Sequence, residues 1–144
     1  MRFNYKGHFP YLSGEKILPL WIFFVHELAG VKMKNIDKVP IPVDVHIARA
    51  TFATGCLTGN YKGNIYEVRE VIDDVWRKAC IGTKYYRLQF DFPLWNLSKY
   101  GCSYRTDNSC IKRSACPISE FCVKGKILVS QNKGVEVNTY IEEN

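Results

Sequence analysis

Four of the six cysteines in this chain are crowded into one short segment, between Cys102 and Cys122. Such crowding constrains the fold, because closely spaced thiols usually share a metal or are joined as disulfides. The residues that follow Met1 lack the pattern of a secretion signal, which favours metal or redox chemistry over a disulfide framework. The other two cysteines, Cys56 and Cys80, stand beside apolar helical sequence, and we expect both to be buried.

The spacing of the four crowded cysteines favours an iron–sulfur cluster. Seven, five and five residues separate Cys102, Cys110, Cys116 and Cys122. Structural zinc sites usually join two thiolates across a Cys-x2–4-Cys turn, and none of these intervals is that short. Wider intervals let the chain wrap around a larger group, so we predict a [4Fe–4S] cluster, with zinc as the alternative. Two disulfides, or four unrelated thiols, are the remaining interpretation.

The charge of the chain indicates a polyanionic partner. The formal net charge is +6 in 144 residues. Around the cysteines, basic side chains outnumber Asp107 and Glu120; they are Arg105, Lys112, Arg113, Lys124 and Lys126. A local basic excess of this kind is typical of nucleic-acid-binding surfaces, although many small basic proteins bind no anion.

Membrane insertion is not expected. The longest apolar run, 18–28, is interrupted by His26 and Glu27 and is shorter than the ~20 residues that a bilayer span requires. Hydrophobic residues make up 47% of the chain, so a folded core is expected. We therefore expect a cytoplasmic, nucleoid-associated protein.

Hydrophobic periodicity predicts an all-α body. Apolar residues recur at helical spacing in four segments: 13–28, 44–55, 65–80 and 88–100. Asp44 is a good N-cap for the second of them. Loops are expected at 33–42 and 60–64.

The end of the chain alternates apolar and polar residues around Asn132-Lys133-Gly134, which predicts a small β-hairpin. We expect three parts: 1–58, 59–126 with the cysteine loop, and the tail 127–144.

Three segments, in order, resemble the endonuclease III family of helix–hairpin–helix DNA glycosylases. Phe9-Pro10-Tyr11-Leu12-Ser13-Gly14-Glu15-Lys16 resembles the hairpin of that family, with one of its two glycines kept. Ile41-Pro42-Val43-Asp44-Val45-His46-Ile47-Ala48-Arg49 resembles its hydrophobic-Val-Asp-Thr-His-hydrophobic-x-Arg segment. The cysteine loop resembles its iron–sulfur loop, whose intervals are six, two and five. The last interval matches, the first is one residue longer and the middle is three longer.

The resemblance implies roles for particular residues. Lys16 stands at the position of the family's nucleophilic lysine, which forms a Schiff base with the sugar C1′. Asp44 stands at the position of its essential aspartate, which assists that reaction. Gly14 would let the backbone approach a phosphate. The cluster would hold Arg105, Lys112 and Arg113 against DNA, and His46 would be a structural hydrogen-bonding residue.

The family has a helical barrel ahead of its hairpin, and only eight residues precede Phe9. The resemblance therefore implies a C-terminal half, and a partner chain could supply the barrel. We predict a DNA N-glycosylase with abasic-site lyase activity on damaged, double-stranded DNA. The alternatives are a non-catalytic iron–sulfur nucleic-acid-binding module and one subunit of a split glycosylase.

Overall fold

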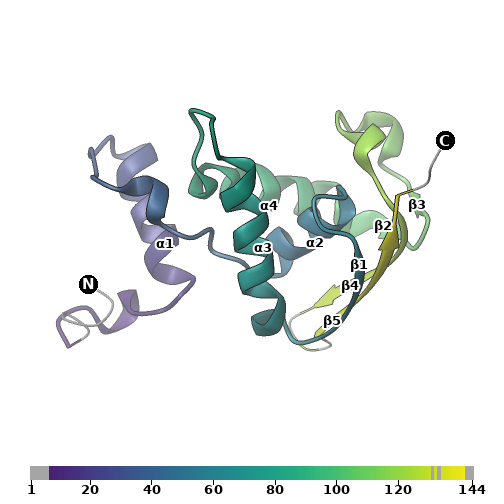
Figure 1. Cartoon of the computed structure of the whole chain (residues 1–144), viewed down its shortest axis with the longest axis horizontal. Helices are drawn as coiled ribbons and strands as arrows, with labels where there is room; N and C mark the ends of the chain where they lie inside the picture. The colour runs from purple at the N-terminus through teal and green to yellow at the C-terminus, as the bar shows by residue number, and fades with distance from the viewer. Residues whose placement is uncertain (1–6, 131, 133, 142–144) are drawn as a thin grey trace.

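The prediction of an all-α fold is wrong. The computed structural model describes residues 7–130, 132 and 134–141, of which 49% are helical and 17% lie in strands. The molecule is mixed, with helices at one end and an antiparallel sheet at the other (Figure 1). In the part of the chain that the structure describes, no helix is both long and apolar enough to span a bilayer.

The four expected helices are present, at nearly the expected positions. They are α1 (Ile17–Phe23), α2 (Val45–Ala53), α3 (Ile65–Ala79) and α4 (Asp91–Tyr100). A π-helical turn, Phe24–Leu28, continues α1. Short 3₁₀ turns span Pro10–Leu12, Ile36–Lys38, Arg87–Phe90, Cys102–Tyr104, Arg113–Ala115 and Ser119–Phe121. The described residues contain no α-helix ahead of Lys16, so a complete helix–hairpin–helix is not seen.

Local chemistry explains where the helices begin. Asp44 accepts hydrogen bonds from the backbone N–H groups of His46 and Ile47 and so caps α2, as expected. Asn64 and Glu67 form a capping box at the start of α3. Helix α1 begins at Ile17 rather than near residue 13, which places Pro19 in the first turn, where its missing N–H does no harm.

The sheet is larger than the expected hairpin. Strands β4 (Lys124–Ser130) and β5 (Gly134–Tyr140) form the hairpin that the tail predicts, and β1 (Gly59–Gly63) pairs with the other edge of β5. We expected a loop at 60–64, because Gly and Asn residues mark that segment. It pairs because Gly134 has no side chain: a Cβ there would lie 2.3 Å from the carbonyl oxygen of Gly63. A second, two-stranded ladder joins β2 (Arg105–Thr106) to β3 (Ser109–Cys110).

Helix α2 is the centre of the core. Ile47, Ala48, Ala50 and Phe52 are fully buried, and α2 packs against α3, α4 and β4. Buried Thr51 accepts a hydrogen bond from the indole of Trp76 on α3 (2.9 Å). Beyond the end of α2, Cys56 is exposed, so the expectation of burial is wrong there, because it lies in a turn rather than on the helix.

A buried ion pair positions the segment that leads into α2. Asp73 on α3 accepts the backbone N–H of Ile41 with one oxygen (2.9 Å) and the Arg87 guanidinium with the other (2.9 Å). Arg87 also donates to the carbonyl oxygens of Lys38 and Val39. Three hydrogen bonds to backbone groups thus hold residues 38–41, the strap, against Asp73 and Arg87, just ahead of the point where Asp44 begins α2.

Candidate active site

The structure brings together the two residues that the sequence nominated for catalysis. The Lys16 Nζ lies 3.1 Å from Oδ2 of Asp44, although 28 positions separate them. Lys16 immediately precedes α1, and Asp44 immediately precedes α2, so each is placed by the start of a helix. The lysine side chain is 43% exposed and the aspartate side chain only 12%. The amine is therefore accessible, while the carboxylate beside it is held within the protein.

The two oxygens of Asp44 do different work. Oδ1 accepts the backbone N–H groups of His46 (2.8 Å) and Ile47 (3.0 Å), which caps α2. Oδ2 contacts Lys16. Since the cap fixes the carboxylate plane, Oδ2 is aimed at the amine before any ligand arrives. Structural capping and a chemical role are therefore compatible in this one side chain.

A hollow of about 300 Å³ opens beside this ion pair. Apart from the ion pair itself, its walls are mostly apolar or aromatic: Leu20, Phe23, Phe24, Pro42, Asp91, Phe92 and Trp95. Such walls suit a flat ring that leaves water, and the amine and carboxylate stand at its margin.

Asp91 is a third ionisable group in this hollow, and no sequence motif marked it as a site residue. It is 8% exposed, at the first residue of α4. Burial, and to a lesser extent the nearby Asp44 carboxylate, raise its pKa to about 6, while Lys16 opposes the shift. No local pattern reveals this role, because Asp91 meets Lys16 and Asp44 only in the folded chain.

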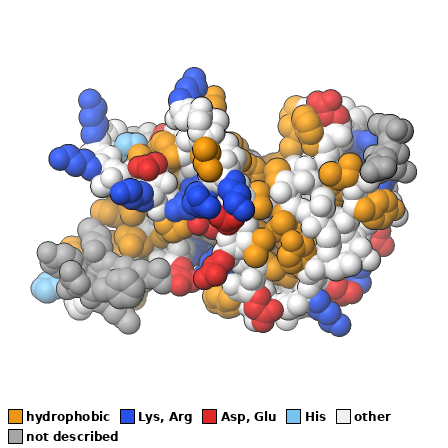
Figure 2. Space-filling view, in the orientation of Figure 1, with side chains coloured by type: hydrophobic (Ala, Val, Ile, Leu, Met, Phe, Trp, Pro, Cys, Tyr) orange, Lys and Arg blue, Asp and Glu red, His pale blue; other side chains and the backbone are white. Residues whose placement is uncertain are grey.

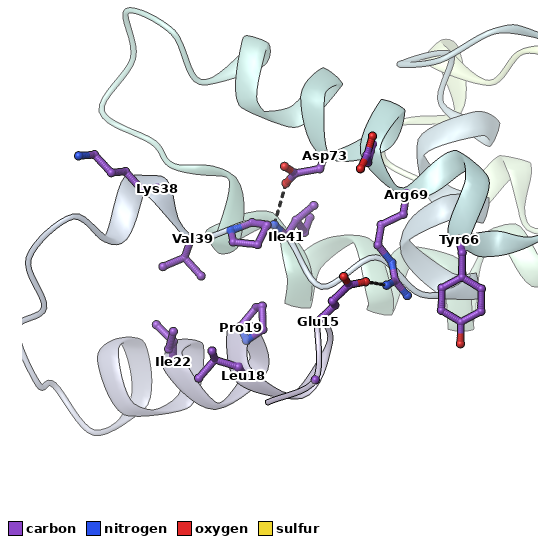
Figure 3. Close-up of a pocket in the computed structure, with 13 residues that line it drawn as sticks. Glu15, Leu18, Pro19, Ile22, Lys38, Val39, Ile41, Tyr66, Arg69 and Asp73 are labelled. Atoms are coloured by element: carbon purple, nitrogen blue, oxygen red, sulfur yellow. Dashed lines mark hydrogen bonds and ion pairs between the residues drawn. The ribbon is translucent and has the colours of Figure 1, made fainter. Parts of the chain in front are cut away.

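The hollow is not the largest on the molecule. On the other side of α1, about 610 Å³ is enclosed between Leu18 and Ile22 of α1, the strap 38–41, and α3 (Figure 3). An ion pair between Glu15 and Arg69 crosses its rim. This larger hollow contains neither Lys16 nor Asp44, so it is not the candidate active site.

The four crowded cysteines surround one small cavity of about 20 Å³. Cys102 follows α4, Cys110 ends β3, and Cys116 and Cys122 each end a 3₁₀ turn. All four are free thiols. Burial, and then the three neighbouring thiols, raise the pKa of Cys102 to about 12, while Arg105 opposes the shift.

The four thiols line one cavity, but their positions do not match the geometry of a metal site. Within residues 7–130, 132 and 134–141, no group of three or more His, Cys, Asp or Glu side chains is arranged to hold a metal ion. The donor set is nevertheless uniform, since the ligating side chains on the cavity wall are the four thiols. No disulfide joins these four thiols in the structure.

Backbone groups of two residues, Gly125 and Val123, join the cysteine loop to the sheet and to α2. The backbone of Gly125 on β4 donates to Asn108 (2.6 Å) and accepts from Arg105 (3.0 Å). The N–H of Val123 donates to the carbonyl oxygen of Ala53 at the end of α2 (3.2 Å). The cysteine loop therefore rests on the end of α2 opposite to Asp44.

The expected DNA contacts divide into two groups. Gly14 lies two residues from Lys16, whereas Arg105, Lys112 and Arg113 line the cysteine cavity. Figure 1 places β2 and β3 at the end of the molecule opposite α1. Arg105 is committed to the Gly125 carbonyl, and Lys112 lies over the Tyr104 ring (5.2 Å). These four residues do not form a single patch with the Lys16–Asp44 pair.

Basic side chains are not confined to the surroundings of the four crowded cysteines. On the face shown in Figure 2, Lys and Arg side chains gather over the half of the molecule that carries α1 and α3, with fewer over the sheet.

One comparison with known proteins gives a match. A family model described as AGOG, N-glycosylase/DNA lyase, matches residues 21–130, which is more than two thirds of the chain. The matched stretch includes Asp44, Asp91 and the four crowded cysteines, and it begins after Lys16. No curated protein and no solved structure gives a significant match. The match supports a glycosylase-related family without singling out the endonuclease III branch.

The raised pKa of Asp91 gives a testable dependence of stability on pH. Folding keeps Asp91 protonated up to about pH 6, whereas the unfolded chain ionises near pH 4, so the free energy of unfolding should fall as pH rises from about 4 to about 6. Asp91→Asn should remove roughly 2–3 kcal/mol of this fall, measured by urea denaturation at several pH values. The matched variant Asp74→Asn changes an exposed carboxylate on α3 and should leave the fall in place. An unchanged pH profile in Asp91→Asn would contradict the assignment.

Proposed function

The chain belongs to the AGOG family of N-glycosylase/DNA lyases, and from this premise we propose that it excises a damaged base from DNA with Lys16 as nucleophile. The observation that carries the proposal is the 3.1 Å contact between the Lys16 amine and the Asp44 carboxylate. A nucleophilic amine needs a nearby group to take its proton, and Asp44 is placed to do so. The family membership supports DNA as the substrate. The contact supports Lys16 and Asp44 as the residues that act on it.

In the proposed reaction the Lys16 amine first attacks the sugar and then, as an iminium, allows the strand to be cut. Lys16 transfers a proton to Asp44, and its free electron pair attacks C1′ of the deoxyribose. The N–C1′ bond forms as the glycosidic bond breaks, and the base leaves with the bonding electrons and takes up a proton. Opening of the sugar ring gives an iminium between Lys16 and C1′. Removal of a C2′ proton then expels the 3′ phosphate, which nicks the strand, and water releases Lys16.

The hollow beside the ion pair suits the other half of this substrate. A base removed from the duplex must be turned out of the stack and held while C1′ is attacked. Walls that include Phe92 and Trp95 can take a flat ring by stacking, with the sugar left at the margin near Lys16.

We propose further that Cys102, Cys110, Cys116 and Cys122 hold a [4Fe–4S] cluster. Four thiols on one cavity wall fit the donor chemistry of such a cluster, and zinc is the alternative for the same set. The cavity of about 20 Å³ is smaller than the cluster, so the loop is expected to open around it. When bound, the cluster would act as a structural cross-link. It would hold Arg105, Lys112 and Arg113 for contact with DNA phosphates.

A second candidate function rests on the wide separation of the two regions. If DNA contacts only the cysteine loop, the chain is a non-catalytic iron–sulfur nucleic-acid-binding module. The exposed amine of Lys16 beside Asp44 favours the enzyme, because a binding module needs no such pair. A partner chain that completes the site, as in a split glycosylase, is compatible with the enzyme.

Borohydride trapping tests the nucleophile. On double-stranded DNA with one abasic site, the full chain should form a covalent adduct, because borohydride reduces the iminium at Lys16 to a stable amine. Lys16→Ala should abolish the adduct, whereas Lys78→Ala, which alters an exposed lysine on α3, should leave it unchanged. Tight DNA binding without an adduct would favour the binding module, and a chain that copurifies would favour the split enzyme.

Asp44 can be tested by separating its two oxygens. Asp44→Asn keeps an oxygen that can cap α2, but it loses the carboxylate that takes the proton, so trapping should slow by about 100-fold or more at nearly unchanged stability. Asp44→Ala should slow it similarly and also cost about 1 kcal/mol of unfolding free energy, because the cap is lost. A trapping rate in Asp44→Asn close to that of the unaltered chain would leave Asp44 with the capping role alone.

Metal content tests the cluster. Protein purified without oxygen should be brown, absorb near ~400 nm and contain about four irons per chain. Cys116→Ser should lose most of the iron, whereas Cys56→Ser should keep it, because Cys56 lies outside the cysteine cavity. A colourless protein with one zinc per chain would replace the cluster with the zinc alternative.

A further inference from the structure

Hydrogen bonds join three polar side chains, His46, Ser98 and Arg49, next to the helix start that Asp44 caps. His46 lies in the first turn of α2, and its ring Nδ1 is 3.3 Å from the hydroxyl oxygen of Ser98 on α4. The Arg49 Nη1, one helical turn further along α2, is 3.1 Å from the same oxygen. Ser98 is fully buried, so its hydroxyl group depends on these partners.

The direction of these hydrogen bonds follows from the chemistry of each group. A guanidinium can only donate, so the Ser98 oxygen accepts from Arg49. The other end of Arg49 is fixed by a bond from Nη2 to the carbonyl oxygen of Val129 on β4 (2.8 Å). The Ser98 hydrogen then needs an acceptor, and among the described residues the structure provides Nδ1 of His46. An Nδ1 that accepts carries no hydrogen, which leaves the ring hydrogen on Nε2.

The surroundings of His46 also disfavour a second proton on its ring. Burial lowers the pKa of His46, and the positive charges of Arg49, Lys16 and Lys99 lower it further, against the opposing effect of Asp44. The ring packs against Trp95, with centroids 5.2 Å apart. The imidazole is therefore held neutral at pH 7.

We propose that Arg49 and Ser98 are positioning residues of the candidate active site, which hold His46 as the neutral tautomer protonated on Nε2. The consequence for the reaction rests on the proposed function. An Nε2 that already carries hydrogen cannot accept a proton from Lys16, and Nδ1 is occupied by Ser98. His46 is thereby excluded as the base, and the proton passes to Oδ2 of Asp44.

Nitrogen NMR of the full chain labelled at histidine tests the tautomer directly. The chain has three histidines, and His46→Gln identifies the signals of His46. Between pH 6 and 8 we expect an unprotonated Nδ1 and a protonated Nε2. Ser98→Ala should give a mixture of tautomers, because Nδ1 loses its donor. Ser103→Ala should change nothing, since Ser103 donates only to the Lys99 carbonyl oxygen. A hydrogen on Nδ1 in the unaltered chain, or no response to Ser98→Ala, would overturn the proposal.

The rate of borohydride trapping against pH gives a readout that loss of packing would not mimic. The unaltered chain should show no inflection near pH 6.5, the ordinary pKa of histidine, that His46→Gln removes. An inflection from Asp91, whose pKa is about 6, should persist in that variant. Ser98→Ala should be slower by roughly tenfold or less and should gain such an inflection, because the freed ring can compete for the proton. Arg49→Lys, which keeps a donor, should be closer to the unaltered chain than Arg49→Met. An inflection near pH 6.5 in the unaltered chain that His46→Gln removes would overturn the proposal.

The two measurements separate the proposals. An inactive chain whose His46 shows the expected tautomer would contradict the proposed function alone. An active chain with hydrogen on Nδ1 would contradict the tautomer proposal alone.

Discussion

The burial of α2 is the constraint on which the remaining structure depends. Five of its nine residues are fully buried, so α3, α4 and β4 must all pack around it. Asp44 caps its first turn, His46 lies within that turn, and its last residue, Ala53, lines the cysteine cavity. One rigid helix therefore connects the candidate active site to the cysteine loop. Because buried α2 side chains cannot shift without opening cavities, the distance between the two regions is fixed by packing rather than by loops.

The ion pair between Asp73 and Arg87 complements this helix from outside the core. It holds the strap before α2 by backbone groups, so the strap needs no regular secondary structure of its own. The strap also lines the larger hollow together with Leu18 and Ile22 of α1, the helix that Lys16 precedes. The Lys16–Asp44 contact thus joins a well-packed helix to a terminal helix that retains exposed apolar side chains, including Ile17, Phe24 and Leu28.

Local signals in the sequence were enough to place the helices. The cap at Asp44, and apolar residues at helical spacing, act over a few residues and were interpreted correctly, whereas Asn64, which caps α3, was assigned to a loop. Strand β1 was missed because its pairing depends on the absence of a side chain at Gly134, more than 70 positions away. For the same reason the fold was assigned wrongly as all-α.

The candidate site divides along the same line. Lys16 and Asp44 were named from a resemblance, and their contact is a property of the folded chain that no spacing reveals. Asp91 and Ser98 were not proposed as site residues, since an aspartate at a helix start and a serine within a helix are ordinary in sequence. Only burial and their neighbours distinguish them. The clustering of the four cysteines was visible because they are close in sequence, whereas the group that they bind stays a prediction.

The order of strands in the sheet bears on how this protein is made. Strand β5 is the last to be synthesised, yet it lies in the middle, between β1 and β4. Its buried Val135 and Val137 complete the apolar cluster around α2. During translation, β1 therefore has no partner strand until β5 has been synthesised, and this part of the core can close only then. Such late, long-range closure is slow compared with local helix formation. A chain that stopped before β5 would lack the valines that pack in the core beside α2, the helix that Asp44 caps.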